Sequence, residues 1–126
     1  MTDPQPVDID EPSILIRISQ LWEPGMSGSE LYDATRGHWT VGLRREHADL
    51  ALAVANGFVR EVYAIESWHQ AGTTPSITSI HSGAPPGRFE FVGLPAADAI
   101  RSKYVGRSVR HYFTQGNQNP IHYVNC

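Results

Sequence analysis

Short runs of hydrophobic and β-branched residues recur along the chain, and each predicts a strand. The first run is Ile14-Leu-Ile-Arg-Ile18. In two longer segments, at about 49–55 and 58–66, large apolar residues alternate along the chain, and Asn56-Gly57 separates the segments. This dipeptide favours a two-residue turn because both of its residues tolerate positive φ. The pattern therefore predicts a β-hairpin.

The first half of this hairpin has a competing interpretation. Residues 47–55 are rich in alanine and would suit a helix that ends at the same dipeptide. We favour the strand because Leu50, Leu52 and Val54 fall on one side of an extended chain. After the turn the alternation continues, with Glu61 as the exception.

Helix signals precede and follow the hairpin. Ser27-Gly-Ser-Glu30 is a capping box that predicts a helix from Ser29 to about Arg36, with Gly37 ending it in the left-handed region. Pro95 stands where another helix would start. The remaining predicted elements are a helix at 96–104, a helical turn at 108–113, and strands at 88–92 and 121–124.

Together these elements define one α+β domain. Residues 1–12, rich in Pro and Asp, predict a disordered tail, and residues 70–88 predict a long loop rich in Gly and Pro. We expect residues 13–126 to form a small β-barrel of five to six short strands, with two to three short helices against it. With 126 residues, 40% of them hydrophobic, the chain can build one core.

Charge is divided unevenly within the net −3. Residues 1–35 hold seven acids and one base, for −6, whereas residues 36–126 hold nine bases and six acids, for +3. The folded part is therefore mildly basic, which is compatible with nucleic acid. The bases after Ala99 would form either a positive stripe or an ordinary solvated helix face, and they are Arg101, Lys103, Arg107 and Arg110.

Other features of the composition concern location and cysteine chemistry. No apolar run approaches the roughly 20 residues that span a bilayer, and the N-terminus lacks the basic start and apolar stretch of a signal peptide. We therefore expect a cytoplasmic protein with no membrane partner. Because Cys126 is its single cysteine, an intrachain disulfide and a thiolate zinc cluster are both excluded.

The segment Trp39-x-x-Gly42-x-Arg44-Arg45, followed by an apolar hairpin, resembles the Trp-x-Gly-Val-Arg-Asn pattern of EVE domains in the PUA-like superfamily. It has one more residue before the glycine, and Arg45 stands where the family has Asn. The resemblance covers roughly residues 36–68. It implies a PUA-like barrel that reads a modified or flipped base in DNA or RNA, within a restriction or defence system. Its second implication is a small ASCH-type hydrolase that processes RNA or a nucleobase.

The residues themselves also meet the physical requirements of a base pocket. An extruded base loses stacking worth on the order of a few kcal/mol, so its receptor needs flat apolar surfaces and hydrogen-bonding groups at the base edge. Trp22, Trp39 and Trp68 would supply the surfaces, with Trp39 the leading candidate because it lies beside Gly37 and a basic cluster. Ordinary core packing is the competing interpretation for each tryptophan.

Amides and arginines would complete such a site. Asn117, Gln118 and Asn119 would read the base edge, although an amide run before Pro120 more commonly caps its own turn. Arginines would bind phosphates, with a solubilising surface role as the competing interpretation. The candidates are Arg36, Arg44, Arg45, Arg107 and Arg110.

Catalytic signatures are sparse by comparison. The six histidines form no His-x-x-x-His or His-Glu-x-x-His arrangement, so we expect neither a metal site nor a cofactor. Acid–base chemistry would require Lys103-Tyr104 or His111-Tyr112 to meet Glu66 or Glu90 in space. The enzyme alternative is therefore minor, and its form would be a metal-independent hydrolase acting on RNA or a modified nucleobase.

A third class is a protein-interaction adaptor without affinity for nucleic acid. Tyr32, Tyr63 and Tyr112 are aromatic residues of the kind that bind protein partners, such as a separate effector protein. Salt-dependent binding to nucleic acid would favour the reader, whereas a stable, salt-insensitive dimer would favour the adaptor.

Overall fold

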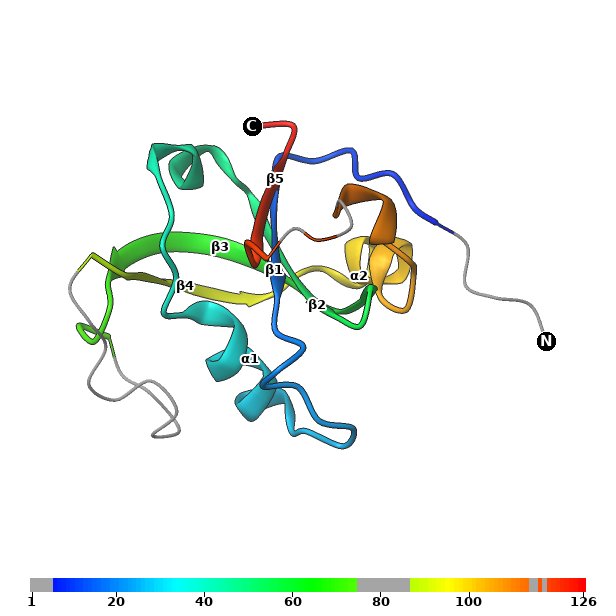
Figure 1. Ribbon diagram of the computed structural model, residues 1–126, viewed down its shortest axis with the longest axis horizontal. Helices are drawn as coiled ribbons and strands as arrows, with labels where there is room; N and C mark the ends of the chain where they lie inside the picture. Colours follow the sequence, from blue (N-terminus) through cyan, green and yellow to red (C-terminus); the bar gives the residue numbers. More distant parts are fainter. Residues whose placement is uncertain (1–5, 75–86, 114–115, 117) are drawn as a thin grey trace.

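The fold is built on one five-stranded mixed sheet. The computed structural model describes residues 6–74, 87–113, 116 and 118–126, and in these residues the strand order is β4-β3-β2-β1-β5 (Figure 1). The strands are β1 (Ser13–Arg17), β2 (Leu50–Ala55), β3 (Phe58–Gln70), β4 (Phe89–Pro95) and β5 (Ile121–Val124). The helices are α1 (Gly28–Arg36) and α2 (Asp98–Tyr104), and the 3-10 turns are η1 (Leu43–His47) and η2 (Arg110–Tyr112). The expected α+β class is confirmed.

The sheet is open rather than closed. β1 runs parallel to β2, and the other three pairings are antiparallel. Among the five strands of the described chain, β4 has β3 as its only neighbour and β5 has β1, so these two strands form the edges. The strands therefore do not close into the expected barrel.

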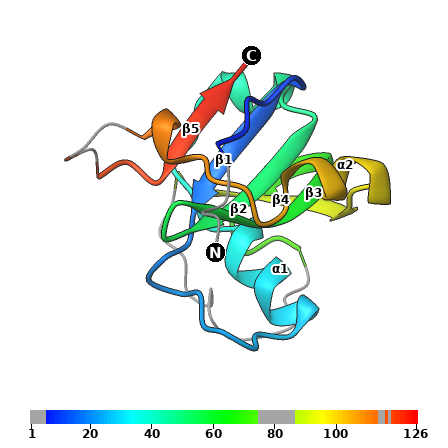
Figure 2. The same ribbon diagram turned by 90° about the vertical axis from the view of Figure 1, so that its right-hand side faces the viewer.

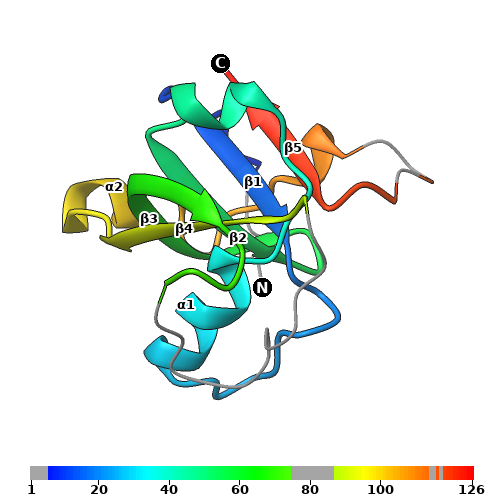
Figure 3. The same ribbon diagram turned by 90° about the vertical axis from the view of Figure 1, so that its left-hand side faces the viewer.

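Both faces of the sheet are covered, and this explains why the alanine-rich residues 47–55 suited both a helix and a strand. All six residues of β2 are buried. Leu52 lies in one core, with Tyr104 of α2, while Ala53 lies in a second core, with Leu31 of α1 packed against it. Figures 2 and 3 show α1 and α2 on different sides of the sheet. A strand buried on both faces is apolar throughout, which is why its sequence also resembled a helix.

The predicted hairpin is present, and a β-bulge explains its one irregular position. Asn56 and Gly57 adopt φ values of 55° and 86°, as a tight two-residue turn requires. The register then shifts, so that Ala53 pairs with Glu61 and Val54 pairs with Val59. Arg60 is the extra residue of this bulge. The insertion interrupts the alternation predicted from the sequence.

Helix α1 begins as predicted and ends differently. The side chain of Ser27 accepts a hydrogen bond from the N–H of Glu30 at 3.1 Å, and the Glu30 carboxylate accepts one from the N–H of Ser27 at 3.3 Å. Gly37, expected in the left-handed region, has φ −169° and ψ 172°. A Cβ at this position would lie 2.8 Å from Glu90 Cβ. Glycine is therefore required here by close packing and not by positive φ.

The N-terminal segment differs from the disordered tail that its composition predicts. Within residues 6–12, Ile9 is 4% exposed and belongs to the core that contains Tyr104. The N–H of Val7 donates to the carbonyl of Ser108 at 3.1 Å. Lys103 contacts the carboxylates of Asp10 and Glu11 at 3.1 and 3.3 Å. Two of the acids that suggested a solvated tail, Asp10 and Glu11, therefore pair with a base of the folded part.

None of the helices in the described ranges is long and apolar enough to cross a membrane. Most of the long loop expected at 70–88 lies outside the described residues, which resume at Gly87. β3 continues to Gln70, beyond the strand end predicted near residue 66, because Gln70 pairs with Phe89 of β4.

Candidate functional site

A buried carboxylate, that of Glu90, contacts residues that lie just before Trp39 in the chain. Glu90 of β4 is fully buried, and its oxygens accept hydrogen bonds from Arg36 Nη1 at 3.0 Å and from the N–H groups of Gly72 and Thr74 at 2.6 and 3.0 Å. The Thr74 hydroxyl also donates to it. His38 Nε2 lies 3.0 Å from Oε1 of Glu90. Glu90 therefore joins the end of α1 to the end of β3.

This cluster is a structural anchor and is poorly suited to acid–base catalysis. Burial by itself raises the pKa of the Glu90 carboxyl, but hydrogen bonds from Gly72, Arg36 and Thr74, together with the Arg36 charge, hold that pKa below its ordinary value. Both oxygens are already occupied by donors. A general base needs a free lone pair within reach of its substrate. The main consequence of the cluster is the fixed position of residues 36–39.

Trp39 follows this anchor directly and is held by its own hydrogen bonds. Its indole Nε1 donates to the carbonyl of Thr35 at 2.7 Å. Its backbone forms an isolated antiparallel bridge with Phe89, with both N–H to carbonyl distances at 2.9 Å. The polar atom of the indole is therefore satisfied within the fold, and the ring packs in part against the core that contains Ala53.

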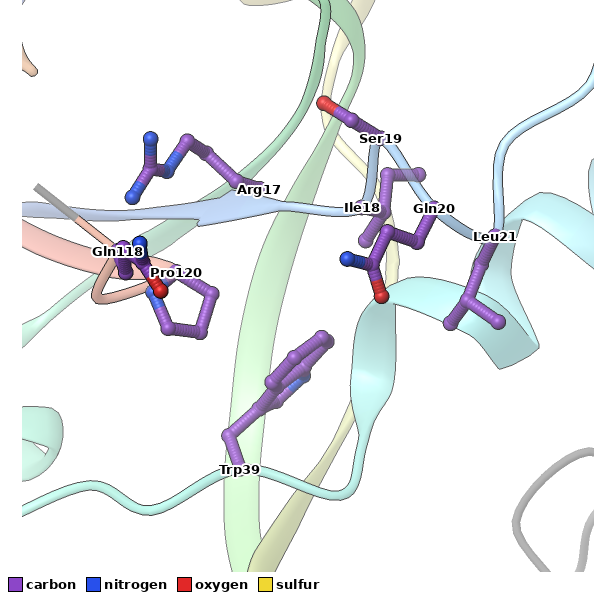
Figure 4. Close-up of a pocket in the computed structure, with 8 residues that line it drawn as sticks. All are labelled: Arg17, Ile18, Ser19, Gln20, Leu21, Trp39, Gln118 and Pro120. Carbon is purple, nitrogen blue, oxygen red and sulfur yellow. The ribbon is translucent and has the colours of Figure 1, made fainter. Parts of the chain in front are cut away.

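The Trp39 ring lines an open cavity of about 590 Å³. Figure 4 shows the ring projecting toward Gln20, with Gln118 and Pro120 on the side opposite Leu21. The other lining residues are Arg17, Ile18 and Ser19, from the end of β1 and the loop that follows it. The volume lies in the range of sites that bind small organic molecules, about 300–1,000 Å³.

The cavity combines an aromatic ring with amides and a guanidinium. Gln20 and Gln118 each carry an amide that can donate and accept hydrogen bonds, as the edge of a nucleobase requires. Arg17 lies 4.6 Å from the centroid of the Phe113 ring, measured from its guanidinium carbon. Gln20 and Arg17 were not predicted as site residues, because a single Gln after a strand and a single Arg within one carry no diagnostic spacing.

The other two tryptophans are not among the residues described as lining this cavity. The guanidinium carbon of Arg60 lies over the Trp22 ring, 4.0 Å from its centroid. Trp68 packs edge-on against Phe91, with ring centroids 5.4 Å apart. The three tryptophans therefore do not form one pocket. All three tryptophans pack in part against the core that contains Ala53, which is the competing interpretation stated for each of them.

The arginines expected on phosphates fall in different environments. Arg36 is only 3% exposed and contacts both Asp33 and Glu90, at 3.1 and 3.0 Å, so its guanidinium is directed into the protein and not toward a phosphate. Arg44 donates to the carbonyl of Cys126 at 2.9 Å. The Arg45 guanidinium carbon lies 4.0 Å from the centroid of the Phe89 ring.

Arg107 and Arg110 lie at the opposite end of the central strands from Arg44. The carbonyl of Arg107 accepts from the N–H of Val59, and Arg110 Nη2 donates to the carbonyl of Asn56 at 3.1 Å, which places both beside the hairpin turn. Arg44, in contrast, reaches Cys126 near the start of β1. The five candidate arginines therefore do not form a single cluster.

The amide side chains of the turn before β5 have different roles in the structure. Asn119 uses its side-chain oxygen to accept from the N–H of Ile121 at 3.0 Å, which is the self-capping role weighed against base recognition. Its neighbour Gln118 lines the cavity. Asn117, a further candidate for the base edge, lies outside the described residues.

In the described ranges, no three His, Cys, Asp or Glu side chains come close enough together to hold a metal ion. No protein-family model, no curated protein and no solved structure matches the chain. The Trp39 cavity is therefore the feature from which a function can be inferred.

Proposed function

We propose that this chain is a nucleic-acid-binding module that receives an extruded base in the Trp39 cavity. The observation that carries the proposal is the cavity itself, which is lined by the Trp39 indole, hydrogen-bonded to Thr35, and by Gln20, Gln118 and Arg17. The segment from Trp39 to Arg45 resembles a sequence pattern of EVE domains, which are PUA-like. Within this proposal the open sheet is a variant of the PUA-like barrel. The base can be a modified one, in DNA or RNA.

The energetics favour a fixed tryptophan. Stacking of a base on an aromatic side chain contributes about 1–3 kcal/mol, which is comparable to the cost of removing that base from its neighbours. An indole that is already hydrogen-bonded to Thr35, on a backbone paired with Phe89, loses little further freedom when a ligand binds. The amides then supply hydrogen bonds that differ between bases, whereas stacking alone does not.

Fluorescence anisotropy with labelled oligonucleotides tests the proposal. Wild type and Trp39→Ala would be titrated, at about physiological ionic strength, with matched single and double strands that carry plain or modified cytosine or adenine. We expect wild type to prefer one base and Trp39→Ala to bind that oligonucleotide about 5- to 150-fold more weakly, as the loss of about 1–3 kcal/mol predicts.

Trp68→Phe is the matched control, because Trp68 packs on Phe91 and is not among the described lining residues. It should retain the preference of wild type. If all oligonucleotides bind weakly and alike to wild type and to Trp39→Ala, base recognition in this cavity is wrong.

A further inference from the structure

A row of alternating aromatic rings and guanidinium groups lies beside the cavity. The Arg60 guanidinium carbon is 4.0 Å from the centroid of the Trp22 ring and 5.7 Å from that of Phe58, and the Arg110 carbon is 4.8 Å from the Phe58 centroid. We call Trp22, Arg60, Phe58 and Arg110 the arginine–aromatic row. Aromatic rings and guanidinium groups are planes of the kind on which nucleobases stack.

The β-bulge of the hairpin places the central arginine of the row. Arg60 is the residue that the shifted register between β2 and β3 leaves without a partner. Its guanidinium turns back to the carbonyl of Ala55, with Nε and Nη2 at 3.2 and 3.0 Å, and lies over Trp22. Bulges commonly redirect a side chain in this way next to functional sites.

The two arginines of the row differ from those that stabilise the fold. Arg101 contacts the Glu61 carboxylate at 2.7 Å, and Arg36 contacts Asp33 and Glu90. The described hydrogen bonds of the Arg60 and Arg110 side chains are instead to the backbone carbonyls of Ala55 and Asn56. In the described part of the chain, neither of these two charges is neutralised by a carboxylate.

One loop connects the row to the cavity. Residues 18–21 line the cavity, and Trp22 follows them directly. This loop is fastened to the hairpin, because the N–H of Ile18 donates to Val54 at 2.8 Å and the N–H of Asn56 donates to the Ser19 hydroxyl at 3.1 Å. Figure 1 shows the loop after β1 close to the turn between β2 and β3. A nucleotide bound in the cavity would therefore have its chain neighbours near the row.

We propose that the arginine–aromatic row binds the single strand that flanks the base in the Trp39 cavity, with bases stacked on its planes and phosphates near Arg60 and Arg110. This inference rests on the proposed function, since it assigns the same ligand a second contact. The occupant is single-stranded because base planes are accessible to stacking only where the strand is unpaired. Row contacts are independent of base identity, whereas the cavity selects the base.

Binding of short and long oligonucleotides to separate variants tests the row. Single strands of about 4 and about 16 nucleotides, of DNA and of RNA, span the site sizes of such surfaces. They would be titrated by anisotropy against wild type, Trp39→Ala, and Arg60→Gln combined with Arg110→Gln. We expect the double variant to bind the long strand about tenfold more weakly, and the short strand as wild type does.

Salt dependence separates charge from stacking. The slope of log affinity against log salt concentration should fall by about 1.4 in the double variant, since each single-strand phosphate contact contributes about 0.7. Arg60→Lys combined with Arg110→Lys should keep the slope and still lose affinity, because an ammonium retains the charge without the plane. Arg101→Gln, which removes an arginine paired with Glu61, is the matched control. Thermal unfolding of each variant verifies that it folds.

The outcomes for the row and for the cavity are distinct. If wild type binds long and short strands equally, or if the double variant binds the long strand as wild type does, the row is not a strand-binding surface and the cavity proposal stands. If the double variant loses long-strand binding while Trp39→Ala retains full affinity and base preference, the row is supported and the cavity proposal fails. If no strand binds wild type, both are overturned.

Discussion

Gly37 and Glu90 approach each other so closely that a Cβ on Gly37 would lie 2.8 Å from Glu90 Cβ and 3.4 Å from Glu90 Cα. The contact brings the end of α1 against β4. Arg36 and His38, on either side of Gly37, both reach the carboxylate of Glu90 from there. The position of Trp39 therefore depends on a glycine that has extended backbone and no turn function.

Gly37→Ala should destabilise the fold by about 1–3 kcal/mol, the usual cost of forcing extra atoms into a packed interior. The neighbouring atoms belong to the backbone and Cβ of Glu90, which cannot rotate away. Urea unfolding of wild type and variant measures the difference. Gly42→Ala is the control, since nothing lies within 4 Å of a Cβ there, and it should change stability little. Equal stability of Gly37→Ala and wild type would contradict the close approach.

Acid should destabilise the protein in part through Glu90. Because its pKa is lowered in the folded state, the unfolded chain binds the proton more readily as the pH falls below the ordinary value of 4.5. The associated stability is fully present above that pH and is lost as the pH falls through the folded pKa. Unfolding free energies measured by urea titration from neutral pH downward should therefore decrease in the acid range.

Glu90→Gln should flatten this pH dependence and cost about 3–5 kcal/mol at neutral pH, because it leaves Arg36 without one of its two buried carboxylates. Some dependence should remain, since hydrogen bonds from Tyr104 and Lys103 lower the pKa of Glu11 against the raising effect of its burial. Glu46→Gln, at an exposed acid, should leave the profile unchanged. An unaltered acid slope in Glu90→Gln would show that Glu90 is not a major source of it.

The elements of the fold follow from local chemistry, and the sequence therefore predicts them well. The capping box of Ser27 and Glu30 and the Asn56-Gly57 turn are encoded within a few residues, and both are present, whereas the bulge breaks the alternation predicted along β3. The open edges of the sheet depend on long-range pairing between β1 and both β2 and β5. No local pattern specifies which distant strands pair. Local patterns therefore could not determine whether the sheet closes into a barrel.

The candidate site was less predictable for the same reason. Trp39 was identified because an aromatic residue beside a glycine and several arginines is a local signal. Arg36 carries the same local signal, yet Glu90, 54 positions away in the chain, holds it inside the protein. Arg60 gave no signal at all, because its direction is set by a bulge whose register involves Ala53 and Val54.

Ile9→Ala should destabilise the protein by about 2–5 kcal/mol, as expected for a buried aliphatic residue. Ile9 packs in the core with Tyr104, whose hydroxyl accepts a hydrogen bond from the N–H of Asp10 at 3.1 Å. Urea unfolding measures the loss, with Leu43→Ala, at a residue that is 79% exposed, as the control. If Ile9→Ala is as stable as the control, the segment before β1 does not contribute to the core.

Gly57→Ala should disturb the arginine–aromatic row from within the turn. The backbone of Gly57 has positive φ, and a Cβ would lie 2.3 Å from both Cγ and Nε of Arg110. The substitution is therefore expected to cost about 1–2 kcal/mol from backbone strain and to displace Arg110 from Phe58. Gly25→Ala is a close control, because Gly25 has φ +84° and nothing lies within 4 Å of a Cβ there. Only Gly57→Ala should weaken binding of long single strands in the anisotropy titration.

The amides of the cavity should control selectivity more than affinity. Gln20→Ala and Gln118→Ala each remove a side chain that lines the cavity without touching the arginine–aromatic row. Since a hydrogen bond contributes about 0.5–1.5 kcal/mol net, each variant should bind the preferred oligonucleotide about 2- to 12-fold more weakly and should discriminate less between bases. Affinity for strands that carry a disfavoured base should hardly change, because stacking on Trp39 does not depend on the base edge.

Competition titrations with unlabelled strands measure both the affinity and the base preference. Gln70→Ala, on the exposed end of β3, is the control. If both variants keep the base preference of wild type, the preference does not arise from these amides, and groups that contact the ligand elsewhere in the cavity must supply it.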